Sequence, residues 1–168
     1  MKGNNLVDMN IFIPIGQDCE VAHYLRRKKL RSQAFPFDWN CASLEMVLNV
    51  LSSDFEGFLD DIYIGKKIRR MYFEDNGVDI KILNEFIYPI IDKKYGILFP
   101  HDYDNIDDNT LAKVKDKYNR RIQRYRETIN NTELAIYLVY GNPHGELNTW
   151  QVSCYKEYDP SLLKLYGE

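Results

Sequence analysis

The sequence predicts a protein of the α/β or α+β class, built as a single domain over residues 1–168. Strand-like apolar segments alternate with amphipathic helical segments along the chain, which is the pattern of a layered α and β fold. The length of 168 residues suits one domain with one hydrophobic core. We therefore expect a mixed sheet, with a helix following the first strand and a long amphipathic helix before the last core strand.

The first expected strand is Met9–Ile15, because the segment is rich in Ile and Phe. Pro14 lacks a backbone donor, which favours an edge position or the end of the strand. Gly16 breaks the apolar run. A helix is then expected at Cys19–Lys29, with Asp18 as its N-cap and a cluster of basic residues in its last turn.

The middle of the chain begins with the loop "SQAFPFDWNC" at residues 32–41, which is dense in aromatic residues. Periodicity and turn signals place the elements that follow it. They are a helix at Ala42–Leu51, a strand at Ile68–Phe73, a turn at Asn76-Gly77, and two hairpin strands at Phe86–Ile91 and Tyr95–Phe99.

The clearest helix is expected at Asp107–Asn130, with two Asp at its start and Arg residues in its second half, as the helix dipole prefers. Its apolar stripe follows the helical period. The stripe consists of Leu111, Val114, Tyr118, Ile122, Tyr125 and Ile129. A strand is expected at Leu134–Tyr140, and Leu147–Tyr158 fits either a strand or a helix.

Composition restricts the function classes. With a net charge of −3, the chain as a whole is not a polycation, so nucleic-acid binding would need a local basic patch. The three cysteines are widely spaced and form no CxxC motif, which argues against a disulfide framework and against a common zinc site. With no apolar run of the roughly 20 residues that span a bilayer and no signal-peptide pattern, we expect a cytoplasmic protein.

Cys19 is the residue whose position suggests chemistry. A thiolate is the reactive form of cysteine, and the free N–H groups of a helix N-terminus favour negative charge there. The same amides, together with the side-chain amide of Gln17, could stabilise an oxyanion. The alternative is that Cys19 is a small residue packed at a turn.

A nucleophilic cysteine needs a base, and His101 is the main candidate because it follows an expected strand. Asp102, Asp38 and Asn142 are the groups that could orient His101. His23 lies four residues after Cys19, where a local contact or a metal half-site is conceivable, but an exposed helical histidine is the favoured interpretation.

The segment "PIGQDCEVAHYLRRKKLRSQAFPFDW", followed downstream by "YGILFPHDY", resembles the DUF1796 family of bacterial proteins, described as papain-like cysteine peptidases. The resemblance covers roughly residues 10–140. It implies a nucleophile at Cys19, a base at His101, a peptide or acyl substrate, and no cofactor or metal. The local cysteine signature of papain is absent, and Gln17 would have to replace the glutamine that usually precedes the nucleophile.

Three other function classes stay open. The helix amides after Gly16 could bind a phosphate or a nucleotide-sugar without catalysis. The "FPFDW" loop could bind a protein partner, although we expect Phe35, Phe37 and Trp39 to pack in the core with Asp38 hydrogen-bonded to a backbone turn. Three basic clusters could bind nucleic acid if they converge, although solvated helix faces are the favoured interpretation. The oligomeric state is not predicted.

Overall fold

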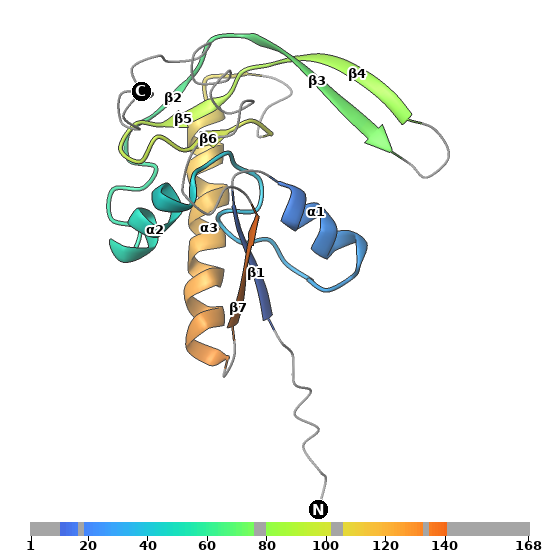
Figure 1. Cartoon of the computed structure of the whole chain (residues 1–168). Helices are drawn as coiled ribbons and strands as arrows, with labels where there is room; N and C mark the ends of the chain where they lie inside the picture. Colours follow the sequence, from blue (N-terminus) through green and yellow to red (C-terminus); the bar gives the residue numbers. More distant parts are fainter. Residues whose placement is uncertain (1–10, 17–18, 76–79, 102–105, 133–134, 141–168) are drawn as a thin grey trace, which may run out of the picture.

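The computed structural model describes residues 11–16, 19–75, 80–101, 106–132 and 135–140. It confirms the expected class, because helices and strands both occur, a helix follows the first strand, and a long helix precedes the last described strand (Figure 1). In chain order the elements are β1 (Ile11–Gly16), α1 (Glu20–Arg27), α2 (Leu44–Ser52), β2 (Ile62–Ile64), β3 (Ile68–Asp75), β4 (Ile80–Ile87), β5 (Ile90–Asp92), β6 (Leu98–Phe99), α3 (Thr110–Asn131) and β7 (Ala135–Tyr140).

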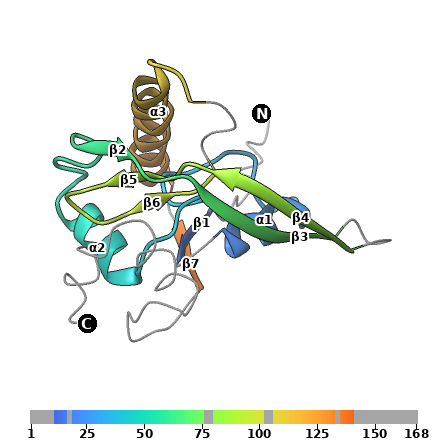
Figure 2. The ribbon, with the colours of Figure 1, turned by 90° about the horizontal axis from the view of Figure 1, so that it is seen from above.

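Parallel and antiparallel pairings both occur, and they fall in separate sheets. β1 pairs with β7 in parallel, with Ile13 opposite Tyr137. β2, β5 and β6 form an antiparallel sheet in that order. Within the described part of the chain β1 has β7 as its strand neighbour, which fits the edge position expected from Pro14. The pairing of β1 with β7 brings the first and last described elements together (Figures 1 and 2).

β3 and β4 form a long antiparallel hairpin that extends beyond the rest of the described ribbon in both views (Figures 1 and 2). The Asn76-Gly77 turn expected between them lies outside the described residues. The expected strand Phe86–Ile91 is instead divided between β4 and β5. Pro89 explains the division, since it has no N–H for a ladder bond; its carbonyl accepts a hydrogen bond from the Gly65 N–H at 2.7 Å.

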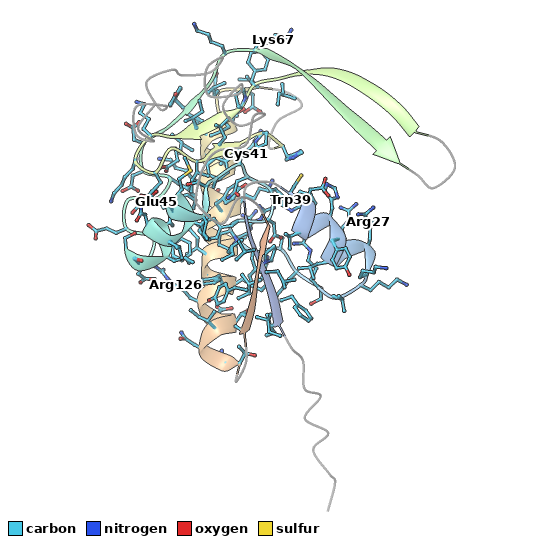
Figure 3. The ribbon with its side chains drawn as sticks, in the orientation of Figure 1. Arg27, Trp39, Cys41, Glu45, Lys67 and Arg126 are labelled. Carbon is cyan, nitrogen blue, oxygen red and sulfur yellow. The ribbon has the colours of Figure 1, made fainter. Side chains whose placement is uncertain are left out.

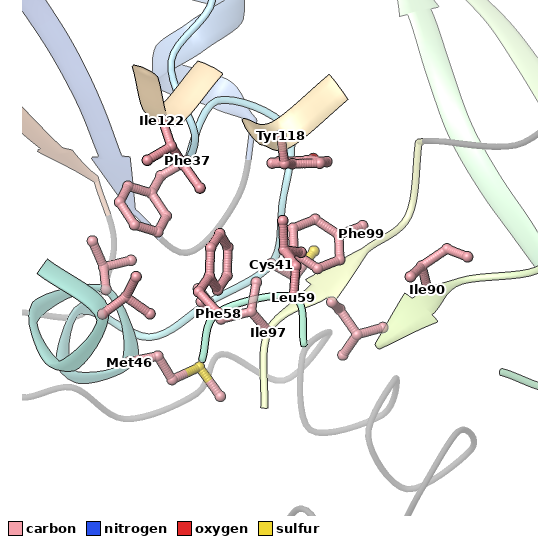
Figure 4. Close-up of a cluster of buried hydrophobic side chains, with 14 of the residues drawn as sticks. Phe37, Cys41, Met46, Phe58, Leu59, Ile90, Ile97, Phe99, Tyr118 and Ile122 are labelled. Atoms are coloured by element: carbon pink, nitrogen blue, oxygen red, sulfur yellow. The ribbon is translucent and has the colours of Figure 1, made fainter. Parts of the chain in front are cut away.

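In the hydrophobic core, α3 packs against α2 and against the antiparallel sheet of β2, β5 and β6 (Figure 4). The α3 stripe is confirmed: its four central residues are buried, and Leu111 and Ile129 pack against them half-buried. The rings of Phe99 and Tyr118 lie 4.6 Å apart at the centre of this cluster. Burying each such side chain stabilises the fold by about 1.5–3 kcal/mol. Core packing therefore fixes β6, the strand that leads to His101.

Helix α1 is shorter than expected at both ends, and Cys19 rather than Asp18 stands at its N-cap position. The helix ends through a left-handed residue, Lys29, with φ of 56°. The Lys29 N–H donates to the Arg26 carbonyl at 3.1 Å and the Leu30 N–H to the Leu25 carbonyl at 2.9 Å. This is a Schellman ending in which lysine takes the position that glycine usually holds.

Helix α3 differs from expectation at its termini. It begins at Thr110 with Asn109 as N-cap, so Asp107 precedes the helix and its first turn holds no acidic residue. Its last turn holds no basic residue either, so the expected match to the helix dipole is wrong. Asp107 forms an ion pair with Lys113 instead, which lowers the pKa of this carboxyl.

Asp92 is a buried carboxylate that ties two loops to the sheet. It accepts hydrogen bonds from the backbone N–H of Leu59 at 2.6 Å and of Tyr95 at 2.8 Å. Burial raises the pKa of this carboxyl, and the backbone donors oppose that effect. Leu59 has φ of 69°, a strained conformation for a branched residue, so the Asp92 contact helps to hold the chain there.

We expect Asp92→Ala to lower the free energy of unfolding by about 2–4 kcal/mol, because buried N–H groups lose their acceptor. Urea denaturation measures the change. The control is Asp61→Ala: Asp61 pairs with Lys93 at 3.0 Å, but both side chains are more than half exposed. That control should cost less than about 1 kcal/mol. Equal losses in the two variants would contradict the role given to Asp92.

Candidate active site

Cys19 stands where β1 has ended and α1 begins. Its carbonyl accepts the first helical hydrogen bond, from the His23 N–H at 2.9 Å, while its thiol makes no capping hydrogen bond. The residue is partly exposed. The thiol therefore lies beside the free N–H groups of the first helical turn, as predicted, although one position earlier than expected. Gln17 and Asp18 lie outside the described residues.

His101 is exposed and follows β6 by two residues. The position of β6 is fixed from the other side by Cys41, whose N–H donates to the Leu98 carbonyl at 2.8 Å and whose carbonyl accepts from the Leu98 N–H at 3.1 Å. Cys41 is buried, so it serves packing and backbone pairing. The fold brings His101 close to Cys19, the two residues proposed from sequence. Asp102 and Asn142 lie outside the described residues.

The indole of Trp39 lies between the two histidines. Its ring centroid is 4.8 Å from that of His23 and 6.1 Å from that of His101, both in edge-on geometry. Phe35 and Phe37 are buried as expected, but Trp39 is only partly buried and contacts the site, so its assignment to the core is wrong. Figure 3 shows Trp39 at the inner edge of α1. A tryptophan beside a buried carboxylate was the available signal.

His23 is half-buried, so the expectation of an exposed histidine is also wrong. Burial against Trp39 lowers the pKa of His23, and the Arg26 guanidinium lowers it further because a second positive charge is unfavourable nearby. The acidic Glu20 opposes this shift. His23 is therefore neutral near pH 7 and presents an uncharged ring to the site.

Asp38 is fully buried and holds the loop that carries Trp39. Its carboxylate forms an ion pair with Arg31, whose side chain is 8% exposed, and accepts from the Phe35 N–H at 3.1 Å. The expected hydrogen bond from Asp38 to a backbone turn is thus confirmed. Burial raises the pKa of Asp38, and the Arg31 charge opposes that rise. These contacts give Asp38 an architectural role next to the site.

Two arginines face the Trp39 ring. The guanidinium carbon of Arg26 lies 5.9 Å from the ring centroid and that of Arg31 lies 5.5 Å from it, both within the range of cation–π attraction. From the sequence, Arg26 was assigned to the helix dipole and Arg31 to a basic cluster with Lys28 and Lys29. The approach of both arginines to Trp39 depends on the reversal at Lys29, which returns the chain toward the helix.

Among the described residues, no group of three or more His, Cys, Asp or Glu side chains is placed to bind a metal ion. Nor does any helix of the described ranges have the length and apolar character needed to cross a membrane. In the basic cluster on α3, Arg124 donates to the Ala34 carbonyl at 2.7 Å and Arg126 donates to the Asp54 carbonyl at 2.7 Å. These two arginines hold loops in place.

We expect Arg31→Met to lower the free energy of unfolding by about 3–5 kcal/mol, since it leaves the buried Asp38 carboxylate without its cation. The double variant Arg31→Met with Asp38→Asn should lose less than the sum of the two single variants, because neither charge is then left unpaired. Urea denaturation of all four proteins measures the coupling. Strict additivity would contradict a buried ion pair.

His23 should titrate below the ordinary histidine pKa of about 6.5, and Trp39→Leu should raise its pKa by exposing the imidazole. Because the folded-state pKa is lowered, the contribution of His23 to stability is present above about pH 6.5 and is lost as pH falls through the folded pKa. NMR titration of the imidazole signals measures both. Tyr24→Leu, an exposed aromatic on the same helix, is the control. A wild-type pKa at or above 6.5 would contradict the burial argument.

Comparison with known proteins adds family membership to this geometry. The family described as "Putative papain-like cysteine peptidase (DUF1796)" matches residues 10–140. The uncharacterized protein R408 of Acanthamoeba polyphaga mimivirus is 22% identical over 137 residues. That match covers 76% of this chain and 60% of the viral protein, so the chain spans less than two thirds of that relative's length. No solved structure matches the chain.

The viral relative lends no support to the bacterial origin that the resemblance implied. The family match, in contrast, spans β1 through β7 and includes Cys19, Trp39 and His101. This chain belongs to the DUF1796 family, which carries that description.

Proposed function

We propose that the chain is a cysteine peptidase or a related acyl-transfer hydrolase in which Cys19 is the nucleophile and His101 the base. The observation that carries the proposal is the proximity of Cys19, at the start of α1, to His101, after β6. These residues are far apart in sequence. Cys19 follows β1 of one sheet, and His101 follows β6 of another. A Cys–His pair assembled at a helix N-terminus is the arrangement that nucleophilic catalysis by a thiol requires.

The reaction begins when His101 accepts the thiol proton and the Cys19 sulfur attacks the carbonyl carbon of an amide, ester or thioester. The N–H groups of the first turn of α1 stabilise the resulting oxyanion, with the Gln17 side chain as a further proposed donor. His101 then gives its proton to the leaving group as the bond to carbon breaks, which leaves a thioester on Cys19. Water, deprotonated by His101, attacks this thioester and releases the acid and the free thiol.

Three groups were candidates for orienting His101, and one of them already has another role. Asp38 is fully buried and its Oδ2 is bound by Arg31 and by the Phe35 N–H, whereas His101 is exposed. We therefore propose Asp102 or Asn142 for this role, with the Trp39 ring restricting the imidazole from one side. An edge contact with an aromatic ring limits the orientations of a histidine and keeps water from one of its faces.

We expect Cys19 to be alkylated with an apparent pKa at least one unit below the free-thiol value of about 8.5, and His101→Ala to bring it back toward that value. The rate of iodoacetamide labelling at each cysteine, measured against pH by mass spectrometry, tests this. Cys41, which is 3% exposed, is the internal reference and should stay unlabelled in the folded protein. Hydrolysis of activated aryl esters should be lost in Cys19→Ala.

Two results would contradict the proposal. If His23→Ala changes the Cys19 titration and His101→Ala does not, the base is misassigned. If Cys19 titrates as an ordinary thiol in every variant, the site is not a thiol hydrolase. In that case the non-catalytic alternative is favoured, and Cys19→Ala should bind a phosphate or nucleotide-sugar ligand as tightly as the wild type does.

A further inference from the structure

Near Cys19 lies a positive charge that has no role in the hydrolase mechanism proposed above. We infer that this site selects substrates with an anionic group, a carboxylate or a phosphate, beside the carbonyl that is attacked, and that Arg26 recognises this group. The inferred substrate class rests on the function proposed above. The charge preference itself is a property of the Cys19 environment and can be measured separately.

Helix α1 has two neighbouring stripes that face different parts of the molecule. Cys19, His23 and Arg26 follow one another at helical spacing, and the latter two contact the Trp39 ring. The second stripe lines a depression of about 340 Å³ against β7. That depression is lined by Glu20, Val21, Tyr24, Arg27, Leu138 and Val139. Glu20, the only acidic residue of α1, lines this depression, although its charge also acts on His23. The charged side chains that approach the Trp39 ring are both arginines, Arg26 and Arg31.

Arg26 supplies the uncompensated charge on the Trp39 side. Arg31 also approaches the ring, but its charge is offset by Asp38. Arg26 is exposed, and within the described ranges no ion pair to an acidic side chain engages it. The ring attracts its guanidinium, which holds the charge over the site.

The distances set the kind of anion that fits. Arg26 is seven residues after Cys19, which is about 10 Å along a helix axis. Because helical side chains lean toward the helix N-terminus, the Arg26 side chain covers part of this distance. An anionic group several bonds from the scissile carbonyl, on the acyl part or on the leaving group, can then approach Arg26 while the carbonyl carbon lies at Cys19. Guanidinium binds carboxylate and phosphate through paired N–H donors, so either group satisfies the site.

The test compares two alkylating agents of similar size, anionic iodoacetate and neutral iodoacetamide. Their rate ratio at Cys19 is measured by mass spectrometry in the full chain at fixed pH and low salt. We expect Arg26→Gln to lower the iodoacetate-to-iodoacetamide ratio about two- to threefold, the size of one exposed charge acting over this distance. Arg26→Lys should keep most of the ratio. Raising the salt concentration should lower the wild-type ratio toward that of Arg26→Gln.

The matched control is Arg27→Gln, which removes the same charge from the next residue, on the stripe that lines the depression against β7. Its ratio should fall less than that of Arg26→Gln, because the Arg27 charge acts on the Trp39 side more weakly than the Arg26 charge does. Equal changes in the two variants, or no change in Arg26→Gln, would overturn the inference. Because Arg26 is exposed, its variants should keep the wild-type unfolding midpoint, and circular dichroism checks this.

The two proposals fail in different ways. If Cys19 titrates as an ordinary thiol but the ratio depends on Arg26, the hydrolase proposal fails and the anion site stands as a binding site. If Cys19 is activated but the ratio ignores Arg26, the hydrolase stands and the substrate class inferred here is wrong.

Discussion

The carboxylate of Asp38 lies in the interior, bound by the Arg31 guanidinium and by the Phe35 N–H, and the geometry of the site depends on it. A buried charge persists only when it is paired and hydrogen-bonded, so the loop cannot leave this conformation without exposing or orphaning two ions. Trp39 is the next residue in the chain. The ion pair thus fixes the backbone position from which the Trp39 side chain contacts both histidines.

The same loop is anchored at its far end by Cys41, which exchanges two backbone hydrogen bonds with Leu98 in β6. Phe99 in that strand packs on Tyr118 of α3. One continuous path therefore runs from the core helix through β6 to His101, and through Cys41 back to Trp39. Cys19 follows β1 of the parallel sheet and stands at the start of α1, and Figure 1 shows these two elements. The functional groups meet where the two sheets and the loop converge.

Two helices end in reversals that turn the direction of the chain. Helix α1 reverses at Lys29 and helix α2 reverses at Asp54, each through a left-handed residue that is not glycine. In α2 the Asp54 N–H donates to the Leu51 carbonyl at 3.1 Å and the Phe55 N–H to the Val50 carbonyl at 2.9 Å, as in α1. A side chain in this conformation costs about 1 kcal/mol, which packing must offset. The first reversal returns the chain so that Arg31 meets Asp38.

The sequence by itself determined the elements whose cause is local. The α3 stripe follows the helical period, the β1 and β7 segments are apolar runs ended by Gly16 and Gly141, and Ser43 caps α2 through its hydroxyl as a preferred N-cap residue. Cys19 and His101 could also be proposed from sequence, because a thiol at a helix start and a histidine after a strand are recognisable patterns. Helix ends without glycine were missed because no local signal marked them. The division of the strand at Pro89 was also missed, although the proline itself was a local signal.

Only the tertiary structure decided which groups meet. Nothing in the sequence placed Trp39 beside His23 and Arg26, because their contacts depend on the ion pair of Asp38 and on the reversal after α1. The parallel pairing of β1 with β7 joins segments separated by nearly the whole described chain, and no local pattern specifies a partner at that distance. Local periodicity fixes elements, whereas burial of shared apolar surface and pairing of buried charge fix their arrangement, because those energies depend on residues distant in sequence.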